Sequence, residues 1–292
     1  RDNVTGLIWE MKTDDNSIHD KDKTFTWCDT NPATNGGNSG TCSIGTGDAA
    51  TDTEAFINAL NSANYGGHKD WRVPTMRELR TLVYSNIQYP VPKIDTAWFP
   101  NTMSSNYCSS TTRQYDNSRV WGVFFGDGAS DGTKFDDYYV RAVRGSQSSS
   151  NLIDNGNGTV TDTATGLMWQ KATAPGTYTW EGALAYCENL NLAGYNDWRL
   201  PDFNELQSLL DYAHSEPAID TPLAADTESS FYWSSTTFHD DNRMAGSVDF
   251  DHGDTGYGGK SSNDYVRAVR STGDTTPDTF VFTDRTGVAL NT

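Results

Sequence analysis

The most constraining feature of this chain is that it contains nearly the same sequence pattern twice. Three blocks recur in the same order, with offsets of 127, 125 and 126 residues. They are Asp70-Trp71-Arg72-Val73-Pro74 with Asp197-Trp198-Arg199-Leu200-Pro201, Cys108 to Thr112 with Trp233 to Thr237, and Tyr139 to Arg144 with Tyr265 to Arg270. Such a period is the size of a complete domain and too long for a solenoid unit. The sequence therefore predicts two copies of one domain.

The repeats also predict the domain boundaries. We expect one domain at residues 1–144, a polar linker at 145–151, a second domain at 152–270, and a linker with a strand-like tail at 271–292. The first copy begins partway through the opening hairpin of the pattern. It also has 33 more residues than the second copy between the Thr-Gly-Leu and Asp-Trp-Arg blocks.

Most of this insertion follows Trp27, where Cys28 and Cys42 flank a loop rich in Gly, Asn and Thr. We expect these two cysteines to form a disulfide, which implies an oxidising compartment. Cys108 and Cys187 lie in different copies, and the spacing does not determine their redox state.

Composition excludes several classes of function. The 292 residues carry a formal net charge of −18, which argues against nucleic acid and anionic membranes as partners and disfavours sulfated polysaccharides. No run of 18 apolar residues occurs, so we expect no membrane span. The chain begins with Arg1 rather than Met, which indicates a mature or trimmed product.

Each copy contains the pattern of two helices followed by short strands. Apolar residues at helical spacing occur in 53–63 and 180–190, and capping-box pairs open a second helix at Thr75 with Glu78 and at Asp202 with Glu205. The remainder alternates short strand patterns with loops rich in Gly and Asp. We therefore predict an α+β class in which each domain has two helices and a mainly antiparallel sheet.

The ordered blocks resemble the C-terminal domain of Legionella collagen-like adhesins. The motifs are Thr-Gly-Leu-Met-Trp, Tyr-Thr-Trp, Asp-Trp-Arg-Leu-Pro, Asn-Glu-Leu, Tyr-Trp-Ser-Ser-Thr and Tyr-Val-Arg-x-Val-Arg, which cover residues 154–270 and, with the insertion, 1–144. The resemblance implies tandem C-type-lectin-like domains, display on a bacterial surface or secretion, and ligand binding. Many relatives have Cys in the last block, where this chain has Ala142 and Ala268, so the resemblance implies that Cys187 lacks its usual partner.

The loops before each Arg-x-x-Arg block differ between the copies, which is where a recognition scaffold places its specificity. We predict non-enzymatic binding of a carbohydrate or protein on a cell surface or matrix. The candidate ligand contacts are Trp121, Asp127, Asp131, His239, Asp251, Asp254 and Tyr257. Trp121 fits a core strand equally well.

Asp249, Asp251 and Asp254 are candidate ligands for Ca²⁺, because carboxylates separated by Gly supply the oxygen atoms this ion prefers. Solvated loop carboxylates are the alternative, and no other cofactor is expected. For the Asp-Trp-Arg and Arg-x-x-Arg blocks we favour structural ion pairs beside a buried Trp. The sequence contains no HExxH, G-x-S-x-G or phosphate-binding Gly loop, so we do not expect an enzyme.

The tail supports an alternative, structural function. Phe282 to Val288 resembles the block from Val160 to Leu167 that the first copy contains only in part. A strand within residues 279–292 of one chain would then complete the next chain, building an extracellular filament or surface array by strand exchange. Packing of the tail on its own chain, or a further β domain, is the simpler interpretation.

Overall fold

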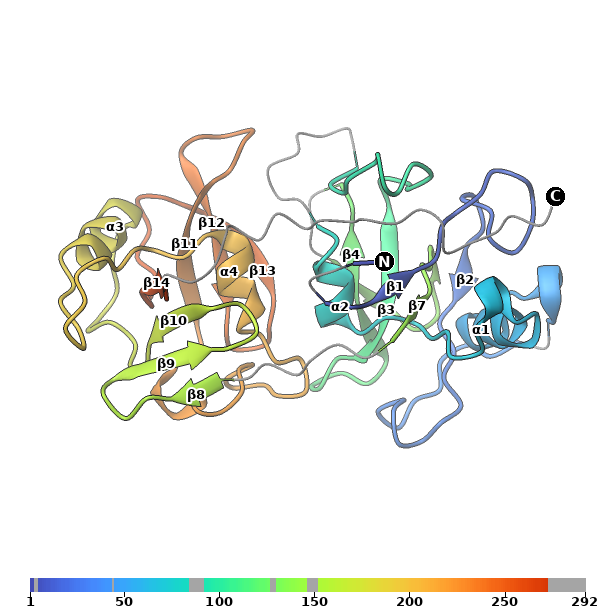
Figure 1. Ribbon diagram of the computed structural model, residues 1–292, viewed down its shortest axis with the longest axis horizontal. Helices are drawn as coiled ribbons and strands as arrows, with labels where there is room; N and C mark the ends of the chain where they lie inside the picture. Colours follow the sequence, from blue (N-terminus) through green and yellow to red (C-terminus); the bar gives the residue numbers. More distant parts are fainter. Residues whose placement is uncertain (3–4, 44, 84–91, 127–129, 146–151, 273–292) are drawn as a thin grey trace. The chain divides into compact units, whose positions relative to one another are not determined.

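The computed structural model describes the chain except for residues 3–4, 44, 84–91, 127–129, 146–151 and 273–292. It divides into two compact units, one within Arg1–Gln147 and one within Ser148–Pro277 (Figure 1). Both are built from small antiparallel sheets and short helices, which places the chain in the predicted α+β class. The tail at 279–292 and most of the predicted linker lie outside the described residues.

The first unit contains two α-helices and three small antiparallel sheets. Its sheets are β3-β4-β5, β1-β7 and β2-β6. The elements are β1 (Ile8–Trp9), β2 (Phe25–Thr26), α1 (Thr53–Ser62), α2 (Met76–Arg80), β3 (Asn106–Thr112), β4 (Arg119–Phe124), β5 (Ser130–Thr133), β6 (Asp137–Tyr138) and β7 (Val143–Arg144), with 3-10 turns at Gly47–Ala49 and Tyr65–Gly67.

The second unit follows the same plan with a fuller opening sheet. Its sheets are β14-β10-β9-β8 and β11-β12-β13, all antiparallel. The elements are β8 (Leu152–Asp154), β9 (Thr159–Asp162), β10 (Leu167–Gln170), α3 (Trp180–Glu188), α4 (Phe203–Ser208), β11 (Phe231–Thr237), β12 (Met244–Asp249), β13 (Thr255–Gly259) and β14 (Val269–Ser271), with a 3-10 turn at Ala224–Asp226.

Both predicted capping boxes are present. The Thr75 hydroxyl accepts the Glu78 N–H at 3.2 Å, and Glu78 accepts the Thr75 N–H at 2.8 Å. Asp202 and Glu205 form the same reciprocal pair at 2.8 Å each. These bonds satisfy amide groups that the first turn of a helix leaves without partners, so the position of each helix start is determined locally.

The repeated Asp-Trp-Arg and Arg-x-x-Arg blocks form ion pairs, as expected, but the Asp and Arg of the first block do not pair with each other. Asp70 does not pair with Arg72; it accepts from Arg144 at 2.8 Å, and Arg72 donates to Glu78. The second unit repeats this arrangement, with Asp197 accepting from Arg270 at 2.7 Å and Arg199 donating to Glu205. Arg72 and Arg199 thus contact the first turn of α2 and α4, and Arg144 and Arg270 tie the last strand of each unit to the loop before that helix.

The second arginine pair, Arg141 and Arg267, is completely buried. Arg141 donates to the Glu10 carbonyl at 2.7 Å and to the Thr102 hydroxyl at 2.8 Å. Arg267 donates to the Lys171 carbonyl at 2.7 Å. Buried charges are tolerated where hydrogen bonds replace water, so these guanidinium groups hold the residues before β7 and β14 against the residues that directly follow β1 and β10.

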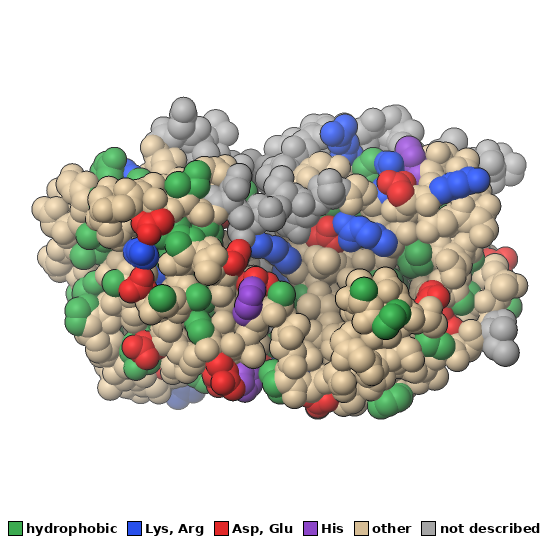
Figure 2. Space-filling model, turned by 90° about the horizontal axis from the view of Figure 1, so that it is seen from below, with side chains coloured by type: hydrophobic (Ala, Val, Ile, Leu, Met, Phe, Trp, Pro, Cys, Tyr) green, Lys and Arg blue, Asp and Glu red, His purple; other side chains and the backbone are tan. Residues whose placement is uncertain are grey.

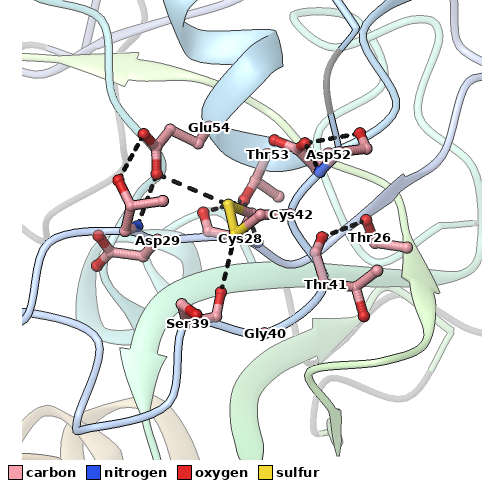
Figure 3. Close-up of a disulfide and its surroundings, with 12 residues drawn as sticks. Thr26, Cys28, Asp29, Ser39, Gly40, Thr41, Cys42, Asp52, Thr53 and Glu54 are labelled. Carbon is pink, nitrogen blue, oxygen red and sulfur yellow. Dashed lines mark hydrogen bonds between the residues drawn. A yellow bond between two sulfur atoms is a disulfide. The ribbon is translucent and has the colours of Figure 1, made fainter.

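The predicted disulfide between Cys28 and Cys42 is present and lies beside the start of α1 (Figure 3). Thr53, the first residue of α1, accepts the Cys28 N–H at 2.9 Å and donates to the Cys28 carbonyl at 2.8 Å. Cys108 and Cys187 are buried free cysteines, and burial raises the pKa of each thiol to about 12. They are therefore protonated thiols inside the two cores.

Candidate functional site

The loop candidates of the second unit lie on the hairpin between β12 and β13. The Asp249 N–H donates to the Asp254 carbonyl at 2.8 Å, and the Gly253 N–H donates to the Asp249 carbonyl at 2.9 Å. Gly253 has φ of +90°, a conformation that side chains disfavour, and so its position needs glycine. These hydrogen bonds fix the backbone conformation of the turn that carries Asp249, Asp251 and Asp254.

The three predicted calcium ligands do not form one cluster. Asp249 is half-buried, and burial raises the pKa of its carboxyl, with the nearby charges of Asp251 and Asp254 adding to the effect. Its Oδ1 accepts the Asp251 N–H at 2.9 Å. Asp251 instead groups with Glu216 and His252, whose ligand atoms all lie within 4.8 Å of one another. Asp254 is partly exposed and lies outside this group.

The donor set of Glu216, Asp251 and His252 combines two carboxylates with an imidazole. Ca²⁺ prefers oxygen atoms alone, so this mixed set suits a transition metal such as Zn²⁺ better. A second group, Asp14 with Asp20 and Asp22, offers only oxygen atoms. The Asp20 carboxylate already accepts the N–H groups of Asp15 at 2.8 Å and Asp22 at 2.9 Å, and backbone hydrogen bonds lower its pKa.

Aromatic rings gather on one side of the β11-β12-β13 sheet. The Tyr257 ring centroid lies 4.2 Å from that of Phe238 and 5.5 Å from that of Phe203, and Phe238 lies 5.0 Å from His239. Tyr257, predicted to be exposed, is only partly so, because α4 supplies Phe203 as a support beneath it. Phe238 is also partly exposed and His239 is exposed. We call Phe203, Phe238, His239 and Tyr257 the aromatic cluster.

Glycine on the central strand makes room for this cluster. A side chain at Gly246 would meet the Phe203 ring at 2.8 Å, and Gly246 pairs directly with Tyr257 across β12 and β13. The missing side chain lets α4 approach the sheet closely. The rings are therefore held by packing on rigid elements, whereas His239 extends from the end of β11.

The candidates of the first unit are placed differently. Trp121, a predicted ligand contact, is 4% exposed, so this prediction is corrected in favour of the core strand. The physical reason is that the Arg113 guanidinium covers the ring, 4.1 Å from its centroid, and also stacks on Tyr115 at 4.5 Å. Asp131 lies in β5, but its side chain lies outside the described residues, as does all of Asp127.

Sequence reasoning missed three groups of residues. The helical spacing places Phe203 on the core face of a helix and gives no sign of a surface cluster. Glu216 and His252 are too far apart in the sequence for any motif to predict that they meet. The third group contains Trp180 and Lys260, whose ring and ammonium lie 3.7 Å apart. A signal for this pair was available, since Lys134 and Lys260 stand at the same offset of 126 residues as the final repeat block.

The surface contains no large apolar area on the described part of the face in Figure 2. Hydrophobic side chains, in green, lie there as separate spots, and acidic and basic side chains are scattered among polar ones. Along the described ranges, no helix has both the length and the apolarity that crossing a membrane would need. The described part of this face therefore has no broad apolar patch of the kind that marks a hydrophobic protein interface.

Comparison with known proteins identifies a family. The family model described as the Lcl C-terminal domain matches residues 1–144 and again 158–270. A comparison with curated proteins gives no match. The two matched segments contain the elements described above, except β8 and the last residue of β14.

Proposed function

The chain belongs to the Lcl C-terminal domain family in two tandem copies, and from this premise we propose that it is a bacterial surface recognition protein. We propose that the protein is extracellular and non-enzymatic, and that it binds carbohydrate through the aromatic cluster of the second unit. Each copy then has a C-type-lectin-like fold. The short helices before small antiparallel sheets in both units support this fold assignment.

The aromatic cluster is the single observation that carries the proposal. Tyr257 and Phe238 present partly exposed ring faces that are held in place from below by Phe203. A binding site of this kind needs aromatic surface with a few polar groups near it, built on rigid elements. The Tyr257 hydroxyl and the partly exposed His239 imidazole, which lies 3.2 Å from Asp240, supply polar atoms beside the rings, as sugar hydroxyls require.

Charge narrows the class of carbohydrate. With a net charge of −18, the chain repels sulfated or carboxylated polymers at long range. The half-buried Asp249 and the Asp251 and Asp254 carboxylates lie on the same hairpin as Tyr257. These acceptors suit neutral sugar hydroxyls, and we therefore propose a neutral glycan as the ligand.

The thiol chemistry agrees with a non-enzymatic function. Both free cysteines of the described residues are buried, with pKa values raised to about 12. A thiol nucleophile needs its pKa lowered and its sulfur accessible, which is the opposite environment. Neither Cys108 nor Cys187 is therefore suited to nucleophilic catalysis.

A glycan array tests the proposal, followed by affinities for the best neutral ligand. Changing Tyr257→Ala removes a stacking face and should weaken binding about tenfold or more, since a stacked aromatic contributes roughly 1–3 kcal/mol. Tyr257→Phe keeps the ring and should retain most of the affinity. Tyr115→Ala, at an exposed tyrosine of the first unit, is the matched control.

Equal affinities for Tyr257→Ala and the wild type, with thermal unfolding unchanged, would remove the aromatic cluster from the site. A parallel array with a chelator addresses the metal hypothesis. Loss of binding with the chelator would show that a cation is required, and its candidate sites would be the Glu216, Asp251 and His252 group and the Asp14, Asp20 and Asp22 group.

A further inference from the structure

In the first unit, the loop closed by Cys28 and Cys42 covers a lysine that is stacked on a tryptophan. Lys134 Nζ lies 4.0 Å from the centroid of Trp27, and donates to the carbonyls of Asn35 at 2.7 Å and Asn38 at 2.8 Å. Lys134 is fully buried and Trp27 is 1% exposed. The ammonium is thus removed from water and is bound by carbonyl groups from a single turn of the loop.

The covering segment is a tight turn, Asn35-Gly36-Gly37-Asn38. The Asn38 N–H donates to the Asn35 carbonyl at 3.2 Å, and both central glycines have positive φ, +63° and +85°. The turn sits very close to the sheet, because a side chain at Gly36 would come within 2.7 Å of Thr112. Asn117 completes the contact by donating its side-chain N–H to the Gly36 carbonyl at 3.2 Å.

The second unit has the same residue types at the equivalent places. The pairs are Trp27 and Trp180, Thr112 and Thr237, Asn117 and Asn242, and Lys134 and Lys260. Hydrogen bonds establish the equivalence. The backbone N–H of Lys134 donates to the Ser118 carbonyl and that of Lys260 to the Arg243 carbonyl, both at 2.8 Å. The indole N–H of Trp27 and of Trp180 likewise reach the carbonyls of Ser109 and Ser234, at 3.0 and 2.9 Å.

This surface of the second unit is open. Trp180 is the first residue of α3, so no inserted loop separates it from the helix as one does in the first unit. Thr237 and Asn242 are exposed, and Trp180 and Lys260 are partly exposed. Among the described residues, the Lys260 ammonium donates one hydrogen bond, to the Thr237 hydroxyl at 2.8 Å, and an ammonium has three N–H donors.

We infer that Trp180, Thr237, Asn242 and Lys260 form a docking surface for a polypeptide turn of a partner protein. The turn would be rich in Gly and Asn, with two backbone carbonyls directed at the Lys260 ammonium and a third at the Asn242 amide. The first unit supplies the argument, because its own turn makes these hydrogen bonds with Lys134 and Asn117 and lies against Thr112, while Lys134 stacks on Trp27. This docking surface shares no residue with the aromatic cluster, so the inference does not depend on carbohydrate binding.

The loop of the first unit provides the probe. A synthetic peptide of residues 28–42, closed by its disulfide and with blocked ends, is titrated into the full chain, whose own first-unit surface is already covered. Saturable changes are expected in the NMR signals of the Asn242 side-chain amide and the Trp180 indole. Lys260→Gln should weaken binding roughly fivefold or more, since a hydrogen bond to a charged donor contributes more than a neutral one.

Two controls make the test specific. Lys171→Gln changes a lysine of the same unit that instead pairs with Asp154, and it should leave peptide affinity unchanged. A linear peptide with both cysteines replaced by serine should bind more weakly, because it must lose more conformational freedom to form the turn.

Three results would overturn the inference. They are no change at Asn242 and Trp180 at millimolar peptide, equal affinities for Lys260→Gln and the wild type, or equal binding of the linear and closed peptides. Binding of a neutral glycan that perturbs these same signals would assign the surface to carbohydrate instead. Tyr257→Ala should leave peptide binding intact, so a failure of either proposal is distinguishable from a failure of the other.

Discussion

The two units share one framework but treat the same surface in opposite ways. In the first unit an inserted loop buries the stacked pair of Trp27 and Lys134, and in the second the equivalent Trp180 and Lys260 remain partly exposed. Burial lowers the pKa of Lys134 to about 8, against the pull of Asp29 in the other direction. The comparison teaches that an insertion can turn an exposed surface into part of a structural core without changing the residues beneath it.

The cores differ by an exchange of position between large and small residues. The second unit buries Trp233 on β11, where the first unit has Cys108 on β3. The first unit instead buries Tyr138 on β6, where the second has Asp264. A Cβ atom added at Gly132 would collide with the Tyr138 hydroxyl, and one added at Gly258 would lie 3.0 Å from the Trp233 ring, so each aromatic fills the space over an equivalent glycine.

The buried polar centres differ in charge. Glu10 accepts from Lys12 at 3.0 Å, from His19 at 2.8 Å and from the Ala142 N–H at 2.9 Å. Burial alone would raise the pKa of Glu10, but the charge of Lys12 and the bond from His19 hold it below its ordinary value. At the equivalent position Gln170 accepts the Ala268 N–H at 3.3 Å and donates to Tyr186 at 2.8 Å. One unit uses an ion pair where the other uses a neutral amide.

The largest expected effect comes from breaking that ion pair. Glu10→Gln leaves the buried Lys12 ammonium without its carboxylate and should cost about 3–5 kcal/mol in the free energy of unfolding. The double variant Glu10→Gln with Lys12→Ala reproduces the second unit, which has Gln170 and Ala172, and should recover part of the loss. Urea denaturation of the single and double variants measures the coupling. Additive losses would mean that the pair does not act as one unit.

The next effect comes from opening the disulfide-closed loop, which covers Lys134 in the first unit and has no counterpart in the second. Replacing Cys28 and Cys42 with serine should destabilise the first unit by roughly 3 kcal/mol, because the unfolded chain regains the freedom of a 15-residue loop. Chemical denaturation with and without a reductant measures this loss. The reductant should have no effect on the double-serine variant, and an unchanged stability would show that packing alone holds the loop.

A smaller effect tests the exchange of core residues. Gly132→Ala adds a methyl group that collides with the Tyr138 hydroxyl, which donates to the Thr133 carbonyl at 2.8 Å. It should destabilise the first unit by about 1–3 kcal/mol. Gly258→Ala meets Trp233 at 3.0 Å and should cost less. Thermal unfolding of the two variants compares them, and a larger loss at Gly258 would contradict the proposed arrangement.

The smallest effect is a pH dependence confined to the covered lysine. The pKa of Lys134 is about 8 in the folded chain, below its value of about 10.4 in an unfolded one, so the unfolded chain binds more protons between these values. The free energy of unfolding should therefore rise by about 1 kcal/mol from pH 8 to pH 9. Urea denaturation across this range measures the rise, and Lys134→Met should reduce it. A fall in stability for the wild type would contradict the burial of a charged amine.

Local patterns predicted the parts of this structure that local forces determine. The capping boxes at Thr75 and Asp202 place the helix starts, and the disulfide of Cys28 and Cys42 follows from cysteine spacing in the insertion. Both depend on residues close together in the sequence. The α+β class follows from the same local signals.

Contacts between distant residues could not be predicted in this way. The spacing of Asp70 and Arg72 suggests a pair within one strand, but Asp70 pairs with Arg144 because the bridge between Arg72 and Val143 brings that distant side chain closer. Trp121 is buried because Arg113 folds over it. Glu216 lies near Asp251 only because the loop that contains it returns to the turn after β12. There the Glu216 N–H donates to the Asp251 carbonyl at 2.7 Å.

The central claim is that carbohydrate recognition belongs to the aromatic cluster of the second unit, and aromatic NMR of the full chain during titration tests it most directly. The best neutral glycan from the array is added while the ring signals of Phe238, His239 and Tyr257 are followed beside those of Tyr115 and Trp121. We predict saturable changes at the first three residues and none at the other two. Changes confined to Tyr115 and Trp121, or the absence of any glycan ligand, would contradict the claim.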